Sequence, residues 1–335
     1  QKNGVNEKLS TARKLIASLK ASRILIKSTQ LKWLIEKGVQ VTNLYGVIPA
    51  RRSKPFKDFV SWVSDERRKG DIDITYAIIG EAAKLVGNSA YGRTGMNKNN
   101  FQKVRFCNEK QFNRAKNNYF FNDAEEYDGV YEVASRPRTV KQNMPIQIAF
   151  NVLNDAKLRM LQFYYDFIDK YIDRSDYQYM YMDTDSAYMA LSANDIKNLI
   201  KPEMKDEFER DEHNWFPRTD TNEHKAYDKR KPGLFKLEWS GTGMIALSSK
   251  TYYCWGSEDK ISCKGTQKNN NKYLLNKESY KKCLHDGTTI NCKNKGFRFV
   301  DKAMKTYEQN KVGITPIYVK GIVMNDGVHV RPLDL

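Results

Sequence analysis

A long apolar periodicity in the middle of the chain constrains the fold more than any other feature. Between Pro145 and Tyr171 apolar side chains recur every three or four residues, at Ala149, Val152, Ala156, Met160, Phe163 and Phe167. This spacing places them on one face of an α-helix, and a proline at the first turn is typical of a helix start. Two strand-like runs follow, 177–182 and 186–191, and predict a β-hairpin. The sequence therefore predicts a mixed α+β fold.

The rest of the chain alternates helical and strand-like patterns without an internal repeat. Helical patterns cover residues 9–37, 56–68 and 74–91, with an apolar interruption at 24–27 and an expected helix end at Gly70. Strand-like runs cover 39–48, 234–239 and 244–255. Residues 93–143 are polar and predict an insertion of loops and hairpins with short strands at 119–122 and 129–133, and the charged residues 203–232 are expected to be peripheral.

The charge balance favours a polyanionic partner. The 335 residues have room for two or three domains and carry 57 Lys and Arg against 40 Asp and Glu, a net charge of +17. Residues 250–320 alone hold 15 basic against 6 acidic residues, an excess of nine. This distribution predicts a phosphate-binding surface in the last third of the chain. A soluble basic protein without such a partner is the alternative.

The cysteines and histidines predict neither a zinc site nor a catalytic histidine. Five cysteines without a close Cys-x-x-Cys pair are expected to be reduced thiols, at Cys107, Cys254, Cys263, Cys283 and Cys292. The four histidines are scattered. No apolar run reaches the roughly 20 residues of a membrane span, so no membrane partner is expected. Because the chain opens on Gln1, we expect it to be a piece of a longer protein.

The predicted hairpin carries two aspartates at its turn. The string Tyr-Met-Asp-Thr-Asp-Ser at 181–186 separates Asp183 from Asp185 by one residue. Such carboxylates lie on one side of an extended chain or together in a turn, where they can share divalent cations. Crowded carboxylates are costly unless cations neutralise them. An ordinary Asp-rich β-turn is the alternative interpretation.

Two other strings predict phosphate contacts. On the helix predicted at 74–91, Lys84, Asn88 and Tyr91 share one face, which suits a nucleoside triphosphate, although a solvated helix face is the alternative. Glycines weaken a helix by about 1 kcal/mol each, so Gly80 and Gly87 indicate a close approach to its backbone. In Lys-Thr-Tyr-Tyr at 250–253, strand alternation sends Lys250 and Tyr252 to one face, suited to gripping a phosphate backbone.

Taken in order, these three strings resemble motifs of the family B DNA polymerases. Lys-x-x-x-Asn-Ser-x-Tyr-Gly and Tyr-x-Asp-Thr-Asp-Ser are similar to the second and third polymerase motifs, and Lys-Thr-Tyr-Tyr to the primer-gripping Lys-x-Tyr. The similarity extends to Phe-Lys-Asp-Phe at 56–59, Pro-Gly-Leu-Phe-Lys at 232–236 and Lys264-Gly265. Over residues 35–335 the chain is most similar to protein-primed members, first those of Maverick/Polinton transposons, then those of bacteriophages and linear mitochondrial plasmids.

The resemblance implies a right-hand polymerase core with helical fingers, an antiparallel-sheet palm and a basic thumb. The implied domains are 1–55, a segment before the fingers that could belong to a protein-priming insertion; 56–92, the fingers; 93–143, an insertion; 144–255, the palm; and 256–335, the thumb. The implied activity is template-directed addition of deoxynucleotides to a primer. The implied partners are a DNA primer-template, dNTPs and a terminal priming protein. The compartment would be nuclear, viral or mitochondrial according to the element of origin.

The resemblance also assigns roles to individual residues. Asp185 would bridge two magnesium or manganese ions, with Asp183 as a secondary carboxylate. Lys84 would contact the incoming triphosphate, and Asn88 and Tyr91 would shape the nucleotide pocket. The DNA-binding residues would be Lys250 and Tyr252, on the primer strand, and Lys264.

One departure from the family pattern leaves a second interpretation open. The family has another metal-binding aspartate in an Asp-x-x-Ser-Leu-Tyr-Pro type motif, and no such string or set of exonuclease carboxylates precedes Lys84. We therefore expect either a polymerase fragment that begins after the first aspartate or a catalytically inactive DNA-binding remnant. An RNA-binding module is disfavoured, because the chain has no RNP, KH or zinc-knuckle signal.

Overall fold

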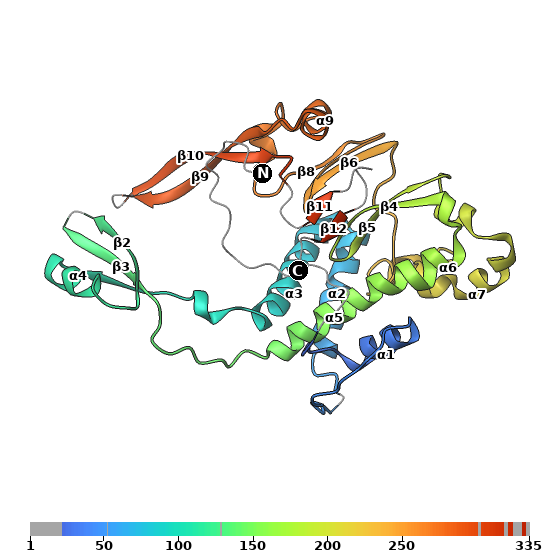
Figure 1. Ribbon diagram of the computed structural model, residues 1–335, viewed down its shortest axis with the longest axis horizontal. Coiled ribbons are helices and arrows are strands. Elements are labelled where there is room, and N and C mark those ends of the chain that lie inside the picture. The colour runs from blue at the N-terminus through green and yellow to red at the C-terminus, as the bar shows by residue number, and fades with distance from the viewer. Residues whose placement is uncertain are drawn as a thin grey trace. The chain divides into compact units, whose positions relative to one another are not determined.

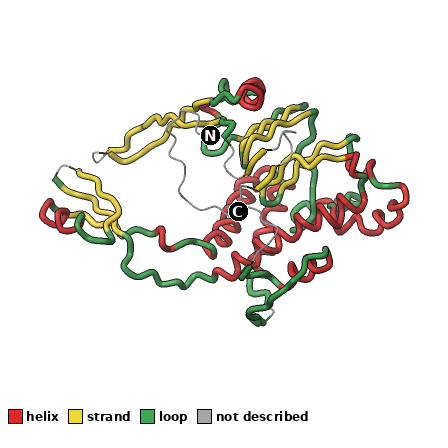
Figure 2. Tube along the Cα trace, in the orientation of Figure 1, coloured by secondary structure: helices red, strands yellow, loops and turns green. Residues whose placement is uncertain are grey.

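The protein is a mixed α+β chain that divides into two compact units. A computed structural model describes residues 22–51, 53–127, 129–300, 303–317, 321–323 and 330–332. The N-terminal unit comprises Lys27–Ser240 and Lys295–Glu308, and the C-terminal unit comprises Gly241–Asn294 with the described residues up to Ile26 and from Gln309 onward. Figures 1 and 2 show several small sheets among the helices, and every strand pair whose register is defined is antiparallel. The predicted α+β class is confirmed.

Two helices in the N-terminal unit pack side by side through glycines. After α1 (Ser28–Glu36) come α2 (Lys57–Ile72), a 3-10 turn at Ile74–Tyr76 and α3 (Ala77–Thr94). A Cβ added at Gly70 would lie 3.3 Å from the Cα of Gly80, and one at Gly87 would lie 3.2 Å from Val63 Cγ1. The glycines in α3 therefore admit the neighbouring helix. The expectation that α2 ends at Gly70 is wrong, because that glycine is the close contact between the helices and α2 continues to Ile72.

The polar insertion folds into a small three-stranded sheet with one helix. After a 3-10 turn at Lys98–Asn100, the strands are β1 (Lys103–Cys107), β2 (Phe121–Tyr127) and β3 (Val130–Ser135), in the order β1-β3-β2. Helix α4 (Glu109–Ala115) was not predicted, although its start carries a capping box between Asn108 and Gln111. The expected strands at 119–122 and 129–133 correspond to β2 and β3 with shifted ends.

The long helix and the hairpin form the main core of the N-terminal unit. The helix consists of α5 (Ile146–Gln162), a π-helical segment (Phe163–Ile168) and α6 (Asp169–Tyr171), as Figure 1 shows in green. The hairpin consists of β4 (Tyr177–Asp183) and β5 (Ser186–Leu191). Phe163, Phe167 and Tyr177 are buried in one apolar cluster, against which Ala187 and Met189 of β5 pack. The predicted helix and hairpin are confirmed, apart from the π segment.

Three expectations for this unit are wrong. Residues 39–48 and 234–239 form no strand: the first run is exposed, and in the second Phe235 leaves any ladder to stack on Phe163 at 3.9 Å between ring centroids. The charged residues 203–232 are not merely peripheral, because α7 (Lys205–Trp215) buries Phe208 and Trp215 in the core. The remaining elements are α8 (Asn222–Asp228) and 3-10 turns at Arg174–Asp176, Ile196–Leu199 and Pro202–Met204.

The C-terminal unit is built on a second antiparallel sheet. Its strands β6 (Gly243–Ser248), β7 (Thr251–Trp255) and β8 (Lys260–Ser262) lie in the order β6-β7-β8. Helix α9 (Lys277–Asp286) packs on β6 and β7. A 3-10 turn at Asn269–Asn271 precedes α9. The long paired strands β9 (Ile290–Val300) and β10 (Ala303–Ile314) follow, and their residues 295–300 and 303–308 belong to the N-terminal unit. The short strands β11 (Gly321–Val323) and β12 (Val330–Pro332) belong to the C-terminal unit. The core centres on Tyr280, which is fully buried among Cys263, Cys283 and Cys292.

The helices of both units are short or polar. Among the described residues, no helix combines the length and the apolar character needed to cross a membrane. The part of the predicted 9–37 helix that precedes residue 22 lies outside the described residues.

Candidate catalytic and nucleic-acid-binding sites

The two aspartates lie at the turn of the β4–β5 hairpin. Asp183 pairs with Ser186 as the last residues of the ladder, so Thr184 and Asp185 form a two-residue turn. Asp183 is half-buried and Asp185 is exposed. The Asp185 N–H donates to the Asp183 carbonyl at 2.6 Å, and the Ser186 hydroxyl donates to the same carbonyl at 3.2 Å. The turn thus holds two carboxylates two residues apart.

Thr184 adopts an unusual backbone conformation between these carboxylates. Its φ is +55°, in the left-handed region where a β-branched residue is rare. Its hydroxyl donates to the Asp183 carboxylate at 3.2 Å. A hydrogen bond from residue i+2 back to residue i around a central positive φ is the pattern of the rarer, strained γ-turn. Backbone strain of this kind costs about 1–3 kcal/mol and clusters at functional sites.

The aromatic side chains of β4 hold this strained turn in place. Tyr179 meets Tyr164 of the π segment at 5.4 Å between ring centroids, and Tyr181 meets Tyr188 of β5 at 5.5 Å. Burial raises the pKa of Tyr179 to about 12, so its hydroxyl is neutral. The β4 register shifts between Tyr179 and Tyr181, which increases the local twist. The turn therefore projects from strands whose tyrosine rings pack on the π segment and on each other.

The aspartate turn fits a hard divalent cation in its donor atoms. Magnesium and manganese prefer carboxylate oxygens, and Asp183 and Asp185, on either side of Thr184, supply four such oxygens. Within the ranges that the structure describes, no group of three or more His, Cys, Asp or Glu is arranged to hold a metal. The donor set of the turn is thus two carboxylates, to which substrate phosphates and water could add ligands.

Helix α3 presents the three residues expected to contact a nucleotide. Lys84, Asn88 and Tyr91 lie at i, i+4 and i+7 of this helix, so they share one face. Lys84 and Asn88 are exposed and Tyr91 is half-buried. The Lys84 ammonium lies 3.3 Å from the Glu81 carboxylate. Exposed ion pairs of this kind are weak, about 0–1 kcal/mol, so a phosphate could displace Glu81.

The expected strand geometry at Lys250 is wrong. Lys250 is not in a strand: it lies in the β6–β7 turn with φ of +63°, and β7 begins at Thr251. Strand alternation therefore does not place Lys250 and Tyr252 on one face. Thr251 and Tyr253 point into the unit and are buried, while Tyr252 is half-buried.

The structure nevertheless brings Lys250, Tyr252 and Lys264 to one end of the β7–β8 ladder. Tyr252 pairs with Ser262, whose hydroxyl donates to the Lys250 carbonyl at 2.9 Å. The Lys264 N–H donates to the Thr251 hydroxyl at 3.4 Å. Both lysines are exposed. These three residues belong to the C-terminal unit, whereas the aspartates and the α3 residues belong to the N-terminal unit.

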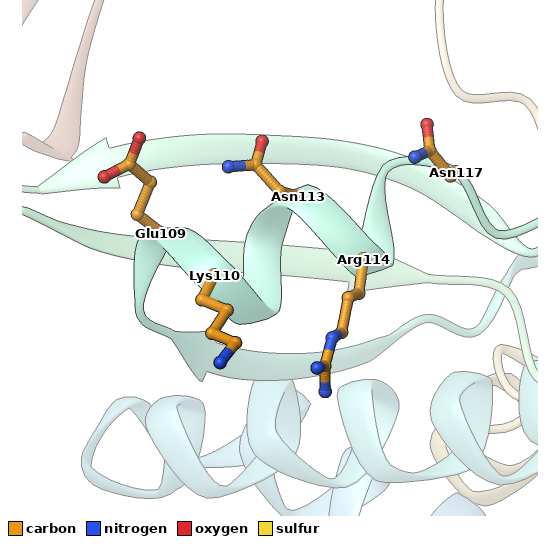
Figure 3. Close-up of a pocket in the computed structure, with 5 residues that line it drawn as sticks. All are labelled: Glu109, Lys110, Asn113, Arg114 and Asn117. Atoms are coloured by element: carbon orange, nitrogen blue, oxygen red, sulfur yellow. The ribbon is translucent and has the colours of Figure 1, made fainter.

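A concave site on α4 does not coincide with the predicted residues. A cavity of about 600 Å³ is lined by Glu109, Lys110, Asn113, Arg114 and Asn117. Figure 3 shows Lys110 and Arg114 pointing to one side of α4, and Glu109 and Asn113 to the other. All five lie on one helix or just after it, so their groups do not converge on a ligand. The cavity therefore gathers no set of catalytic groups.

The cysteines behave as packing residues. All five are free and buried. Burial raises the pKa of Cys283 and of Cys292 to about 11, so both remain neutral thiols at physiological pH. Neutral thiols are poor nucleophiles and poor metal ligands.

Comparison with known proteins identifies no relative. No family model, no curated protein and no solved structure matches the chain.

Proposed function

We propose that this chain is the core of a template-directed DNA polymerase of the family B, protein-primed type. The observation that carries the proposal is the aspartate pair on a strained, rigidly supported hairpin turn, within a Tyr-x-Asp-Thr-Asp-Ser string. The position of this string in the chain, after the α3 residues and before Lys-Thr-Tyr-Tyr, further supports the proposal. A helical pair and antiparallel sheets are compatible with fingers and palm in a right-hand arrangement.

The proposed roles follow from the chemistry of each group. Asp183 and Asp185 would hold divalent ions, magnesium or manganese, which when bound activate the primer hydroxyl and stabilise the leaving pyrophosphate. Lys84, Asn88 and Tyr91 would bind the incoming dNTP. In the C-terminal unit Lys250, Tyr252 and Lys264 would hold the DNA primer-template.

The alternative is a catalytically inactive DNA-binding remnant of such a polymerase. It is favoured by one sequence observation: the 335 residues contain no Asp-x-x-Ser-Leu-Tyr-Pro string to supply a further metal-binding carboxylate. Both interpretations predict DNA binding, and only the first predicts templated nucleotide addition by the protein that carries this sequence.

Template-directed primer extension with two lysine variants tests the proposal. We expect Lys84→Gln to raise the KM for dNTP at least about tenfold, since a hydrogen bond to a charged group contributes about 1.5–3 kcal/mol. We expect Lys250→Asn to weaken primer-template binding with an unchanged KM for dNTP. Asparagine tolerates the positive φ at this position, so the variant removes the charge and not the turn.

Lys69→Gln is the matched control, because Lys69 is an exposed lysine of the neighbouring helix α2 that pairs with Glu66 at 2.7 Å. It should behave as wild type. Kinetically indistinguishable Lys84 and Lys250 variants would refute the division of roles. The 335 residues alone contain no further Asp motif and are expected to extend a primer little or not at all, so the assay uses the protein that carries this sequence. If that protein binds DNA without extending a primer, it is the inactive remnant.

A further inference from the structure

A preorganised loop follows β8 beside the predicted DNA-binding lysine Lys264. Gly265 is exposed and adopts φ of +76°. Asn294 of β9 fixes the loop from both sides: its amide donates to the Gly265 carbonyl at 2.8 Å and accepts from the Gln267 N–H at 2.9 Å. The Thr266 hydroxyl donates to the Cys263 carbonyl at 3.0 Å. The loop is therefore held in one conformation by its own hydrogen bonds.

The ammonium of Lys311 occupies the space that a side chain at position 265 would need. A Cβ added at Gly265 would lie 2.6 Å from Lys311 Nζ and 3.2 Å from its Cε. Lys311 lies on β10, 46 positions further along the chain than Gly265, and was not singled out from the sequence. Glycine at 265 thus serves two purposes: it permits the left-handed backbone, and it admits the lysine from β10.

Cations gather at this loop without acidic partners. Neither Lys264 nor Lys311 forms an ion pair within the described residues. The Gly265 N–H has no hydrogen bond to any described residue and can donate to an anion. A left-handed glycine whose N–H is available and which lies beside an ammonium group, here that of Lys311, is typical of an anion-binding concavity.

We propose that Lys264, the Gly265 backbone and Lys311 form a binding site for a backbone phosphate of the DNA strand. This inference rests on the proposed function and extends the predicted DNA contacts to β10. The Ser262 hydroxyl donates to the Lys250 carbonyl, and the Lys264 N–H donates to the Thr251 hydroxyl, so both lysines lie at the same end of the β7–β8 ladder and one DNA strand could contact both. A nucleotide carries the same phosphate oxygens. We assign the site to a DNA strand and not to a nucleotide, because only a strand presents successive phosphates to several separated cations.

The test is the salt dependence of binding to a fluorescent primer-template duplex by the 335-residue chain. On duplex DNA each phosphate contact adds about −0.9 to the slope of log affinity against log salt. We expect Lys311→Gln to reduce the steepness by about 0.9 and to lower affinity about tenfold at low salt. Lys281→Gln is the control: it removes the same charge from the same unit, from a lysine paired with Glu278. It should leave the slope within about 0.3 of wild type.

Gly265→Ala provides a second readout that does not remove a charge. The added methyl group should displace the Lys311 ammonium and reduce the slope as Lys311→Gln does, with little further effect in the double variant. Because alanine at φ of +76° is strained, thermal unfolding of each variant accompanies the binding measurement. Lys311 is exposed, so Lys311→Gln keeps the test valid if Gly265→Ala does not fold.

Three results would overturn the inference. The first is an unchanged slope for Lys311→Gln while Lys250→Asn and Lys264→Gln both reduce it, which leaves the proposed function standing. The second is a loss of dNTP binding, measured without DNA, in Lys311→Gln while duplex binding is intact, which assigns the site to the nucleotide. The third is a wild-type slope near zero, which removes the proposed function together with the site.

Discussion

At the scale of single residues, the conformation of Thr184 is the feature that most distinguishes the candidate site. A threonine with φ of +55° in a two-residue turn costs energy that glycine would avoid, since a left-handed L-residue loses about 1–2 kcal/mol. The Thr184 hydroxyl donates to the Asp183 carboxylate, an interaction that glycine could not provide. The strain is consistent with selection for the position of the aspartates over the stability of the hairpin.

Replacing Thr184 by glycine should therefore stabilise the fold and impair the site. Relief of about 1–2 kcal/mol exceeds the entropic cost of glycine, about 0.5–1 kcal/mol. We expect the free energy of unfolding to rise by up to about 1 kcal/mol, measured by urea denaturation, while nucleotide addition slows. Ser249→Gly is the control, because Ser249 is a turn residue of the β6–β7 hairpin without a positive φ. The Ser249→Gly variant should have a lower free energy of unfolding than wild type. An equal loss of unfolding free energy in both variants would contradict the strain at Thr184.

Residue types alone could not separate the roles of the glycines. The sequence indicates a close approach to the helix backbone at Gly80 and Gly87, and the neighbours are Gly70 and Val63 of α2, not a ligand. A glycine indicates that something comes close, and only the fold identifies the neighbour. At Gly265 the neighbour is the ammonium of Lys311. The sequence separation between β8 and β10 concealed that contact.

At the scale of elements, the charged region 203–232 contains two ion pairs: one joins it to α2, and the other lies within the region. Arg230 donates to the Asp71 carboxylate of α2 at 2.7 Å. Arg218 chelates the Asp228 carboxylate, with Nε at 2.7 Å from one oxygen and the second guanidinium nitrogen at 3.0 Å from the other. The Asp228 side chain is fully buried, so this ion pair is shielded from solvent on one side. Composition suggested a solvated periphery because it does not show which charges are paired.

The Arg218–Asp228 pair should make stability depend on acidic pH. The hydrogen bonds from Arg218 lower the pKa of Asp228 to about 2, below the unfolded value of about 3.9. The carboxylate therefore stabilises the fold above pH of about 4, and this contribution is lost as the pH falls toward 2. We expect Asp228→Asn to lower the free energy of unfolding by about 1–3 kcal/mol at neutral pH and to remove this part of the acid sensitivity.

Thermal unfolding between pH 7 and pH 2 measures this effect, with Asp206→Asn as the control. Asp206 is exposed and has no ion pair in the described residues, so its variant should follow the wild-type pH profile. An Asp228→Asn profile parallel to that of wild type across the acid range would show that the carboxylate has no depressed pKa.

Elements with strong periodicity were predictable, and those decided by long-range contacts were not. The helix over 145–171 and the hairpin around Asp183 follow from local spacing alone. The run 234–239 has strand composition, but Phe235 gains more from stacking on Phe163 and from donating its N–H to Trp215 than a strand would offer. The expected strand position of Lys250 is wrong for a related reason. Lys250 lies in the hairpin turn, where the alternation of side chains along a strand does not apply.

At the scale of the whole molecule, the candidate residues divide between two compact units. The aspartate turn and α3 lie in the N-terminal unit, and the lysines of the β7–β8 ladder lie in the C-terminal unit. Of the excess of nine positive charges over residues 250–320, seven belong to the C-terminal unit, whose part of this range, 250–294 and 309–320, holds 11 basic against 4 acidic residues. The implied palm, 144–255, is therefore divided between the two units, with the aspartates in one and Lys250 and Tyr252 in the other. The motifs could be found from sequence, whereas Lys311 required the fold.

The central claim is that the carboxylate of Asp185 serves nucleotide addition, and a single substitution tests it most directly. In the protein that carries this sequence, the rate constant for single-nucleotide addition to a bound primer is measured for Asp185→Ala and for the exposed control Asp206→Ala. Loss of a metal ligand should cost several kcal/mol of barrier, and each 1.4 kcal/mol is about tenfold in rate. We predict a rate constant far below about one tenth of wild type for Asp185→Ala, with unchanged primer-template affinity and an unaffected control. A rate constant above about one tenth of wild type would contradict the account.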